Sequence, residues 1–455
     1  MRVFRSVLAA MAVAFAAPAV AETPNAQIDA IIREVLAETR SPSASVAVVQ
    51  DGRIAHLAAF GNARLDPPVA ATIETRYGIA SVSKQFTAAS ILLLAEDGKL
   101  SLDDPVGRYV PDLTDGDKIT LRHVLNNVSG YTDYWPQDFV FARMKQPANR
   151  DDILDGWART PLEFPTGTEY RYSNTGFVVA GLVVEKVSGQ SLFDFQKKRI
   201  FGPLRMTGVT EDDTAPLRSP DAANYTRYAD GPLRPADKEG AGWLFAAAHL
   251  AMRPADLALW NISLLDASLL KPASIAVMTT PAVLTSGEPT SYALGLRVSV
   301  QDGRRVWSHG GALSGVHTDN RIWPDDKLAI SVMVNTEDNQ AQSVIAERLA
   351  FLLLPSTGSA AVMRGLLADA AAGRIDRTRL TPNADAFFTP QVLADYQASL
   401  SALGPLRLLR PTGASKRGGM TYAGFDAVYA GKVLWVSLRM TPDGRIEQFM
   451  AGPKV

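Results

Sequence analysis

Cysteine is missing from all 455 residues of the chain. This absence excludes structural disulfides, a thiol nucleophile and any metal site built on cysteine ligands.

Histidine is scarce, and charge of neither sign is in excess. No two of the five histidines stand four residues apart, the helical spacing typical of metal ligands. Lysine and arginine number 46 against 47 aspartates and glutamates, so the formal net charge is −1. The sequence therefore predicts no metal and no other cofactor, and the balanced charge argues against nucleic acid as a partner. The histidines are His56, His123, His249, His309 and His317.

Long apolar runs are also missing, apart from one at the N-terminus. There Arg2 and Arg5 precede an apolar run from Val7 to Val20, and Ala19-Val20-Ala21 offers small residues for cleavage. The run is too short for a membrane span and polar residues follow it, so we interpret residues 1–21 as a secretory signal peptide. We expect a periplasmic or secreted protein with no membrane span.

Strand patterns occur at both ends of the main part of the chain. Ala44 to Val49 and Ile54 to Phe60 flank Asp51-Gly52, a pair typical of a tight hairpin turn. Helical patterns lie between the two groups of strands and at both ends of this part. The sequence therefore predicts an α+β domain over residues 22–355, with one antiparallel sheet assembled from both ends and a large helical insert. The later strand patterns are 293–300, 306–309, 316–323 and 329–335, and the terminal helix patterns are 26–39 and 343–354.

The remaining residues are interpreted as a second unit. Turn-forming residues at 355–359 mark the end of the first domain. We interpret residues 356–385 as a linker that contains a helix from Ala361 to Ala372, and residues 386–455 as a small accessory α+β domain. In the latter, a helix pattern covers 390–403 and strand patterns cover 406–409, 421–429, 433–440 and 446–450.

The segment Ala80-Ser81-Val82-Ser83-Lys84 places a serine three residues before a lysine, where an extended segment turns into an apolar helix. Residues i and i+3 share a helix face, so Lys84 should lie beside Ser81 Oγ. A neutral amine there could take the hydroxyl proton as the oxygen attacks a carbonyl. The alternative is a polar helix start, in which Ser81 caps the helix and Lys84 is solvated. The spacing alone does not decide between them.

Two further motifs follow in order: Tyr172-Ser173-Asn174 and His309-Gly310-Gly311. With Ser81-x-x-Lys84 they form S-x-x-K, Y-x-N and H-x-G, and the sequence here resembles the serine β-lactamase and penicillin-binding-protein-like hydrolases. Its nearest kin look like class C β-lactamases, D-aminopeptidases, DD-peptidases and β-lactamase-like carboxylesterases. The resemblance covers roughly residues 25–355. It implies a sheet of the five-stranded type, flanked by terminal helices, as in the β-lactamase/transpeptidase-like fold.

The resemblance also implies roles for the motif residues. Ser81 would be the nucleophile, and the backbone N–H groups of Ser81 and Ala312 would form the oxyanion hole. Lys84 can act as a base only if burial lowers its pKa by roughly three units from about 10.4. Tyr172 is its natural partner and could relay a proton to the leaving group. Which of Lys84 and Tyr172 is the general base is left open by the sequence.

Asn174 of the second motif has two possible roles. It could hold Lys84 and donate to a substrate amide, or it could serve as the N-cap of the next helix.

The third motif departs from the family pattern. His309 stands where most relatives have the lysine of K-T-G, and a histidine, mostly neutral at pH 7, holds a substrate carboxylate less firmly. Gly310 and Gly311 would leave room for substrate backbone, or could mark a β-bulge.

These observations predict a secreted serine hydrolase that forms an acyl-enzyme on Ser81 and acts on peptide-like amides or short-chain esters. H-x-G favours the D-amino-acid peptidase or esterase type, with weak or no β-lactamase activity. The alternative is a penicillin-binding, cell-wall peptide-binding protein with little turnover. We expect a small-molecule or peptide substrate, selected by loops around Tyr131–Trp135 and Ala222–Gly242 and by the C-terminal module. The oligomeric state is left open.

Overall fold

The main sheet brings the two ends of the first domain together. The computed structural model describes residues 24–137 and 139–454 of the chain, so the segment interpreted as a signal peptide lies outside the described residues. Seven strands form one antiparallel sheet in the order β3-β2-β1-β12-β11-β10-β9. The early strand β1 pairs with the late strand β12 from Ala44 opposite Val334 to Gln50 opposite Leu328. The strands are β1 (Ser43–Gln50), β2 (Arg53–Leu65), β3 (Pro68–Ala70), β9 (Arg297–Gln301), β10 (Arg304–Leu313), β11 (Val316–Trp323) and β12 (Leu328–Val334).

This topology confirms the α+β fold and the sheet built from both ends. The short edge strands β3 and β9 extend the five-stranded type to seven strands. The strand pattern at 293–300 was wrong in its first half, because Ala293 N–H donates to the carbonyl of Leu296 and closes a turn there. Strand β9 therefore starts only at Arg297.

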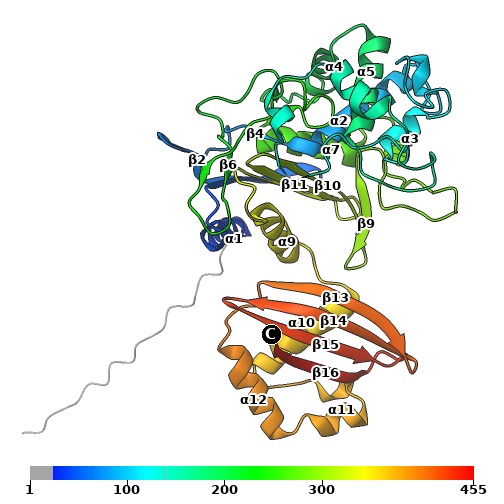
Figure 1. The fold of residues 1–455 in the computed structure, drawn as a ribbon. Coiled ribbons are helices and arrows are strands. Elements are labelled where there is room, and N and C mark those ends of the chain that lie inside the picture. The colour runs from blue at the N-terminus through cyan, green and yellow to red at the C-terminus, as the bar shows by residue number, and fades with distance from the viewer. Residues whose placement is uncertain (1–23, 138, 455) are drawn as a thin grey trace, which may run out of the picture.

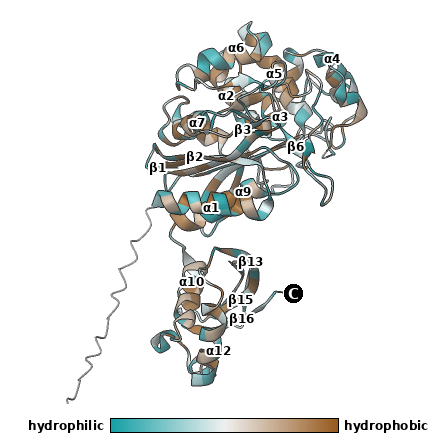
Figure 2. Ribbon diagram, turned by 90° about the vertical axis from the view of Figure 1, so that its left-hand side faces the viewer, coloured by the Kyte–Doolittle hydropathy of each residue, from teal (hydrophilic) through white to brown (hydrophobic). Residues whose placement is uncertain are grey.

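Alternation along the strands supplies two apolar faces for two helical layers. On β1, Ala44, Val46 and Val48 pack against α1 (Pro24–Thr39) and α9 (Ala341–Leu353). Residues of opposite parity on the same strand, Ala47 and Val49, pack into the larger core on the other face. Figure 2 shows α1 and α9 side by side on one face of the sheet and the large helical region on the other.

The helical region carries the S-x-x-K segment at the start of α2 (Ser83–Glu96). Every residue of α2 from Ser83 to Leu94 is buried, including the polar residues Ser83, Lys84, Gln85, Thr87 and Ser90. Other elements of this region are α3 (Leu121–Leu125), α4 (Arg150–Ile153), α5 (Asn174–Ser188), α6 (Leu192–Gln196), α7 (Pro254–Asp266), α8 (Pro272–Met278), β4 (Tyr77–Gly78), β5 (Thr210–Glu211), β6 (Tyr225–Thr226), β7 (Arg234–Pro235) and β8 (Leu250–Met252).

The C-terminal residues form a module with its own core, seen below the main sheet in Figure 1. Its four strands follow in chain order in one antiparallel sheet. Met363, Leu366 and Leu367 of α10 are part of this core, so the helix expected in a linker belongs to the module, since its apolar face packs on the sheet. The elements are α10 (Gly358–Ala371), α11 (Pro382–Phe387), α12 (Pro390–Ser401), β13 (Leu408–Arg417), β14 (Met420–Tyr429), β15 (Lys432–Met440) and β16 (Ile446–Pro453).

Ion pairs join this module to the sheet-covering helices α1 and α9. Arg407 pairs with Glu34 and Glu38 of α1, and Arg410 lies 2.8 Å from Glu347 of α9.

Within the described part of the chain, no single helix combines the length and the apolarity needed to cross a membrane, although two sharply bent helix pairs meet that test by length and composition.

Candidate active site

Ser81 lies in a single 3₁₀ turn, η1 (Ala80–Val82), directly before α2 (Ser83–Glu96). Ala80 has a φ of 49°, in the left-handed region that residues other than glycine seldom adopt. The cap position of α2 is Val82 and no side chain caps it, so Ser81 is not the helix cap of the polar alternative. Sequence reasoning placed Ser81 at the helix start but did not foresee the 3₁₀ turn.

Lys84 is fully buried, which also rules out the solvated lysine of that alternative. Its Nζ lies 3.1 Å from Ser81 Oγ, 2.7 Å from Asn174 Oδ1 and 2.9 Å from the carbonyl oxygen of Ala247. Burial lowers the pKa of Lys84 to about 7, against the opposing attraction of Asp133. A substantial fraction of this amine is therefore neutral near pH 7 and able to accept a proton.

Tyr172 precedes α5 and stands over the amine. Lys84 Nζ lies 4.9 Å from the centre of the Tyr172 ring. Burial raises the pKa of Tyr172, and a hydrogen bond with Ser81 only partly opposes this. The neutral phenol is consequently the stable form of Tyr172 at pH 7.

Asn174 is the first residue of α5 rather than its cap, which is Ser173. Its side chain joins two groups: the carbonyl oxygen accepts from Lys84, and the amide nitrogen donates to Asp133 at 3.1 Å. Asn174 is therefore not the N-cap of this helix, and its contact with Lys84 agrees with the other role predicted for it.

His309 on β10 is buried and held at both ring nitrogens. Nδ1 lies 2.5 Å from the carbonyl oxygen of Gly310, and Nε2 lies 2.9 Å from the hydroxyl of Tyr292. Because a carbonyl can only accept, Nδ1 carries the proton and Nε2 accepts from Tyr292. Burial, aided by the positive charge of Lys84, lowers the pKa of His309 to about 3. The ring is thus a neutral structural group at pH 7 rather than a cation.

The two glycines after His309 have different surroundings. A Cβ at Gly311 would lie 2.3 Å from the carbonyl oxygen of Ile79, so only glycine lets β10 approach the segment before Ser81 this closely. A Cβ at Gly310 would meet only the carbonyl oxygen of Thr318, at 3.8 Å. The register of β10 with β11 is continuous through both, so neither marks a β-bulge.

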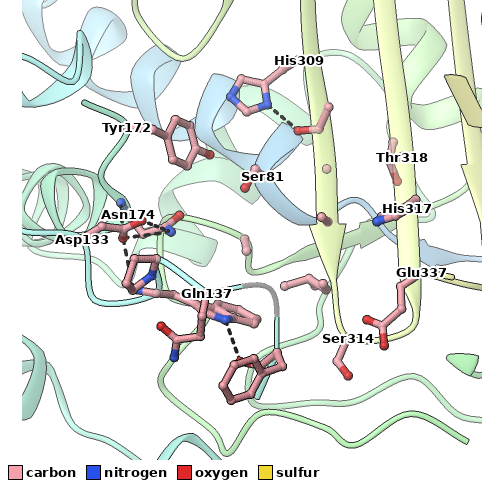
Figure 3. A pocket seen from close by; sticks show the side chains of 18 of the residues that line it. Ser81, Asp133, Gln137, Tyr172, Asn174, His309, Ser314, His317, Thr318 and Glu337 are labelled. Carbon is pink, nitrogen blue, oxygen red and sulfur yellow. Dashed lines mark hydrogen bonds between the residues drawn. The ribbon is translucent and has the colours of Figure 1, made fainter. Parts of the chain in front are cut away.

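A cavity of about 980 Å³ opens over Ser81. Figure 3 shows Ser81 between Tyr172 and Asn174 on one side and strand β10 on the other. All the predicted site residues except Lys84 line it, and Lys84 lies beneath Ser81. These lining residues are Ser81, Tyr172, Asn174, His309, Gly310, Gly311 and Ala312. In the described residues, no group of three or more His, Asp or Glu side chains is placed to hold a metal ion.

The loops expected to select the substrate contribute unequally. Asp133, Tyr134 and Trp135 line the cavity, as expected for the first loop. The loop at 222–242 does not line it; Glu239 instead accepts from the N–H of Ser314 and supports the β10–β11 turn. The C-terminal module also contributes no lining residue.

Sequence reasoning missed several lining residues outside the motifs. Arg297 on β9 and Glu337 after β12 bring opposite charges to the cavity, and Phe139 brings an exposed aromatic ring. The positions of Arg297 and Glu337 depend on how distant strands pair in the sheet, which no local pattern encodes. Asp133 could have been found from the sequence, although only weakly, because this acidic residue lies between aromatic residues in the loop that was predicted to select the substrate.

The comparisons with known proteins agree with this geometry. A family model described as Beta-lactamase matches residues 28–354. The D-aminopeptidase of Cereibacter sphaeroides is 31% identical over 318 residues, which are 68% of this chain and 60% of that relative. A D-aminopeptidase of Brucella canis is 30% identical over 72% of this chain and 63% of its own length. The chain thus spans less than two thirds of the length of these curated relatives.

Solved structures show the same fold. The D-stereospecific amidohydrolase from a Streptomyces species is 26% identical, with a TM-score of 0.58 over 68% of this chain and 94% of its own. The octameric penicillin-binding protein homologue from Pyrococcus abyssi is 21% identical, with a TM-score of 0.63 over 94% of this chain and 99% of its own. The chain therefore belongs to the beta-lactamase family, the serine β-lactamases and penicillin-binding-protein-like hydrolases that its three motifs resemble.

Proposed function

We propose that this chain is a secreted serine hydrolase that forms an acyl-enzyme on Ser81. Its substrates would be peptide-like amides or short-chain esters, of the D-amino-acid peptidase or esterase type. The observation that carries the proposal is the amine of Lys84, buried 3.1 Å from Ser81 Oγ with a pKa of about 7.

Acylation would begin with Lys84 as the general base. Neutral Lys84 takes the proton of Ser81 as Oγ bonds to the substrate carbonyl carbon. The negative charge that develops on the carbonyl oxygen would meet the N–H groups of Ser81 and Ala312, and each such donor is typically worth about 10²–10³ in rate. Tyr172 is the weaker candidate for the base, because burial raises its pKa and favours the neutral phenol.

The leaving group then needs a proton. Tyr172 stands over Lys84 Nζ and close to Ser81, so its hydroxyl could give that proton to the departing amine or alkoxide while it regains one from protonated Lys84. Neutral Lys84 is thereby restored. A water molecule then attacks the ester of Ser81 with the same groups in reverse roles, and the acid is released.

Two observations support the substrate class. Curated relatives are D-aminopeptidases, and one structural neighbour at 26% identity is a D-stereospecific amidohydrolase. His309 is buried and neutral at pH 7, so the position that is lysine in most β-lactamases provides no cation for a β-lactam carboxylate. We therefore expect weak or no β-lactamase activity.

The test is a substrate panel with Ser81→Ala as the blank. It contains p-nitrophenyl acetate and butyrate, D-alanyl and L-alanyl p-nitroanilide, and a chromogenic cephalosporin. We expect turnover of the short esters and of the D-anilide, and slow cephalosporin hydrolysis. Fast cephalosporin turnover with no ester or anilide activity would refute the substrate class, and activity that survives in Ser81→Ala would refute the nucleophile.

The alternative, a cell-wall peptide-binding protein with little turnover, makes a different prediction for intact mass. A hydrolase should show a fluorophosphonate adduct on wild-type Ser81 and none on Ser81→Ala. If the wild type forms no adduct and turns over none of the panel, the binding protein is favoured.

A further inference from the structure

Asp133 lies in the loop after α3, with its carboxylate at the start of α5. Oδ1 accepts from the backbone N–H of Asn174 at 2.9 Å and from the N–H of Trp135 at 3.2 Å. The same carboxylate accepts from the Asn174 side-chain nitrogen, at 3.1 Å to Oδ1 and 3.3 Å to Oδ2. Figure 3 shows Asp133 and Asn174 together at one side of the cavity, on the far side of Ser81 from β10. None of the three motifs includes this residue.

These contacts allow only one orientation of the Asn174 amide. An ionised carboxylate accepts hydrogen bonds and cannot donate, so the amide nitrogen must face Asp133. The amide oxygen is then turned toward Lys84 Nζ, 2.7 Å away. In the flipped amide, the oxygen would face the carboxylate and the nitrogen would face the amine, so both contacts would become repulsive.

The orientation of the amide decides where the lone pair of Lys84 points. A neutral amine has two N–H groups and one lone pair. Asn174 Oδ1 and the carbonyl oxygen of Ala247 can only accept, and they take both N–H groups, at 2.7 and 2.9 Å. The third neighbour is Ser81 Oγ at 3.1 Å, so the lone pair is left for its hydroxyl proton.

We propose that Asp133 is a positioning residue for the catalytic base: it fixes the Asn174 amide so that Lys84 directs its lone pair at Ser81. This inference rests on the assignment of Ser81 and Lys84 in the proposed function.

Asp133 is also the charged group that affects the pKa of Lys84. Tyr172 is a neutral phenol at pH 7, since burial raises its pKa. His309 and His249 are both buried, which lowers the pKa of each to about 3. The negative charge of Asp133 favours the ammonium form of Lys84 and so raises its pKa, against the larger effect of burial. Removing that charge should lower the pKa of Lys84.

The test measures how fast a fluorophosphonate labels Ser81, as a function of pH, in the full chain. In Asp133→Ala we expect the plateau rate to fall by roughly 10–100-fold, because the amide and the lone pair lose their fixed direction. The acid limb of the profile should also move to lower pH. In Asp133→Asn the same limb should move, but the rate loss should be smaller, since the new amide oxygen can still accept from Asn174. A side chain with only a structural role would not move the limb.

Two further variants isolate the route of the effect. If Asp133 acts through Asn174, adding Asp133→Ala to Asn174→Ala should change the plateau rate by less than about threefold, because residues that act through one contact are not additive. The matched control is Asp151→Ala, which removes an exposed aspartate paired with Arg159 and should label like the wild type.

Either of two results would overturn the proposal. One is a folded Asp133→Ala variant with the wild-type rate and limb; the other is a fully additive loss in the double variant. If Asp133→Ala does not fold, as judged by circular dichroism, Asp133→Asn and its pair with Asn174→Ala carry the same test. The labelling measurements do not require the substrate to be known. If the wild type is labelled but turns over nothing in the panel, the proposed hydrolase function is contradicted, while the role of Asp133 is still tested by the labelling rates of its variants.

Discussion

Two buried nitrogen bases lie near Ser81, Lys84 on the helical side and His309 on the sheet side. Burial is the largest cause of a lowered pKa at both. Lys84 moves from 10.5 to about 7, and His309 from 6.5 to about 3. A similar burial therefore gives a base that exchanges protons near neutral pH in one place and a permanently neutral ring in the other.

Burial alone therefore does not make a catalytic base. The ordinary pKa of the side chain decides whether the buried group still exchanges protons near pH 7. The partners of the two groups agree with this division. Lys84 keeps a contact with Ser81 Oγ, whereas both ring nitrogens of His309 are occupied by Tyr292 and Gly310. We therefore expect substitutions on the two sides to act on different properties.

The largest effect is expected on the helical side. Lys84→Met should lower the rate of Ser81 acylation by roughly 10³–10⁴, since it removes the general base while it keeps an apolar chain in the site. In the wild type, kcat/KM should rise with pH through about 7, because Lys84 must be deprotonated to act. Stopped-flow acylation by p-nitrophenyl acetate measures both. Lys118→Met, at an exposed ion pair with Asp115, is the control and should leave both unchanged; a loss of less than tenfold in Lys84→Met would contradict the role of the base.

On the sheet side, the neighbouring glycines provide a matched pair. Gly311→Ala should lower the acylation rate by roughly 10², because its Cβ would lie 2.3 Å from the carbonyl oxygen of Ile79 and push β10 away from the nucleophile. Gly310→Ala, whose Cβ meets nothing closer than 3.8 Å, should stay within a few-fold of the wild type. Equal losses in the two variants would show that the close approach of β10 to Ile79 does not matter for the rate.

The pH dependence of the free energy of unfolding should reveal how much the buried amine of Lys84 destabilises the folded chain. Between pH 7 and 10.5 the unfolded chain binds a proton at Lys84 that the folded chain does not, so the free energy of unfolding should rise with pH in this window. Lys84→Met lacks the penalty and should be more stable at pH 7 by roughly 2–4 kcal/mol. The gain should shrink as the pH approaches 10.5. Urea unfolding at several pH values measures the difference, and parallel curves for the two proteins would contradict the lowered pKa.

The sequence predicted the helical side of the site better than the sheet side. Ser81 and Lys84 are three residues apart on one chain segment, so helical periodicity alone brings them together. The contact of Asn174 with Lys84 needs two helices to pack, and only the family resemblance suggested it. The partners of His309, by contrast, follow from how β9, β10 and the segment at Tyr292 fold against one another, which no local pattern contains.

The same limit explains what the sequence missed in the fold. Alternation and turn residues located most strands, because each strand buries one or two faces. The 3₁₀ turn at Ser81 packs closely against β10 at Gly311, a contact between distant segments. The late start of β9 follows from a local turn, in which Ala293 N–H donates to the carbonyl of Leu296. The sequence predicted helix α10 as part of a linker, because the residues that it packs against, such as Phe425 and Phe449, lie far along the chain.

The smallest effect is expected when His309, on the sheet side, is replaced by lysine, the residue type of the base on the helical side. In His309→Lys, a pKa lowered by burial as far as that of Lys84 would end near 7 rather than near 3. The amine would then be partly charged at neutral pH, and a bound carboxylate would raise its pKa further. We expect acylation by a chromogenic cephalosporin to increase by roughly tenfold, in line with about 1.4 kcal/mol from one charged contact. Ester turnover, which involves no carboxylate, should change much less, and an equal change in both would show that the charge at this position does not select the substrate.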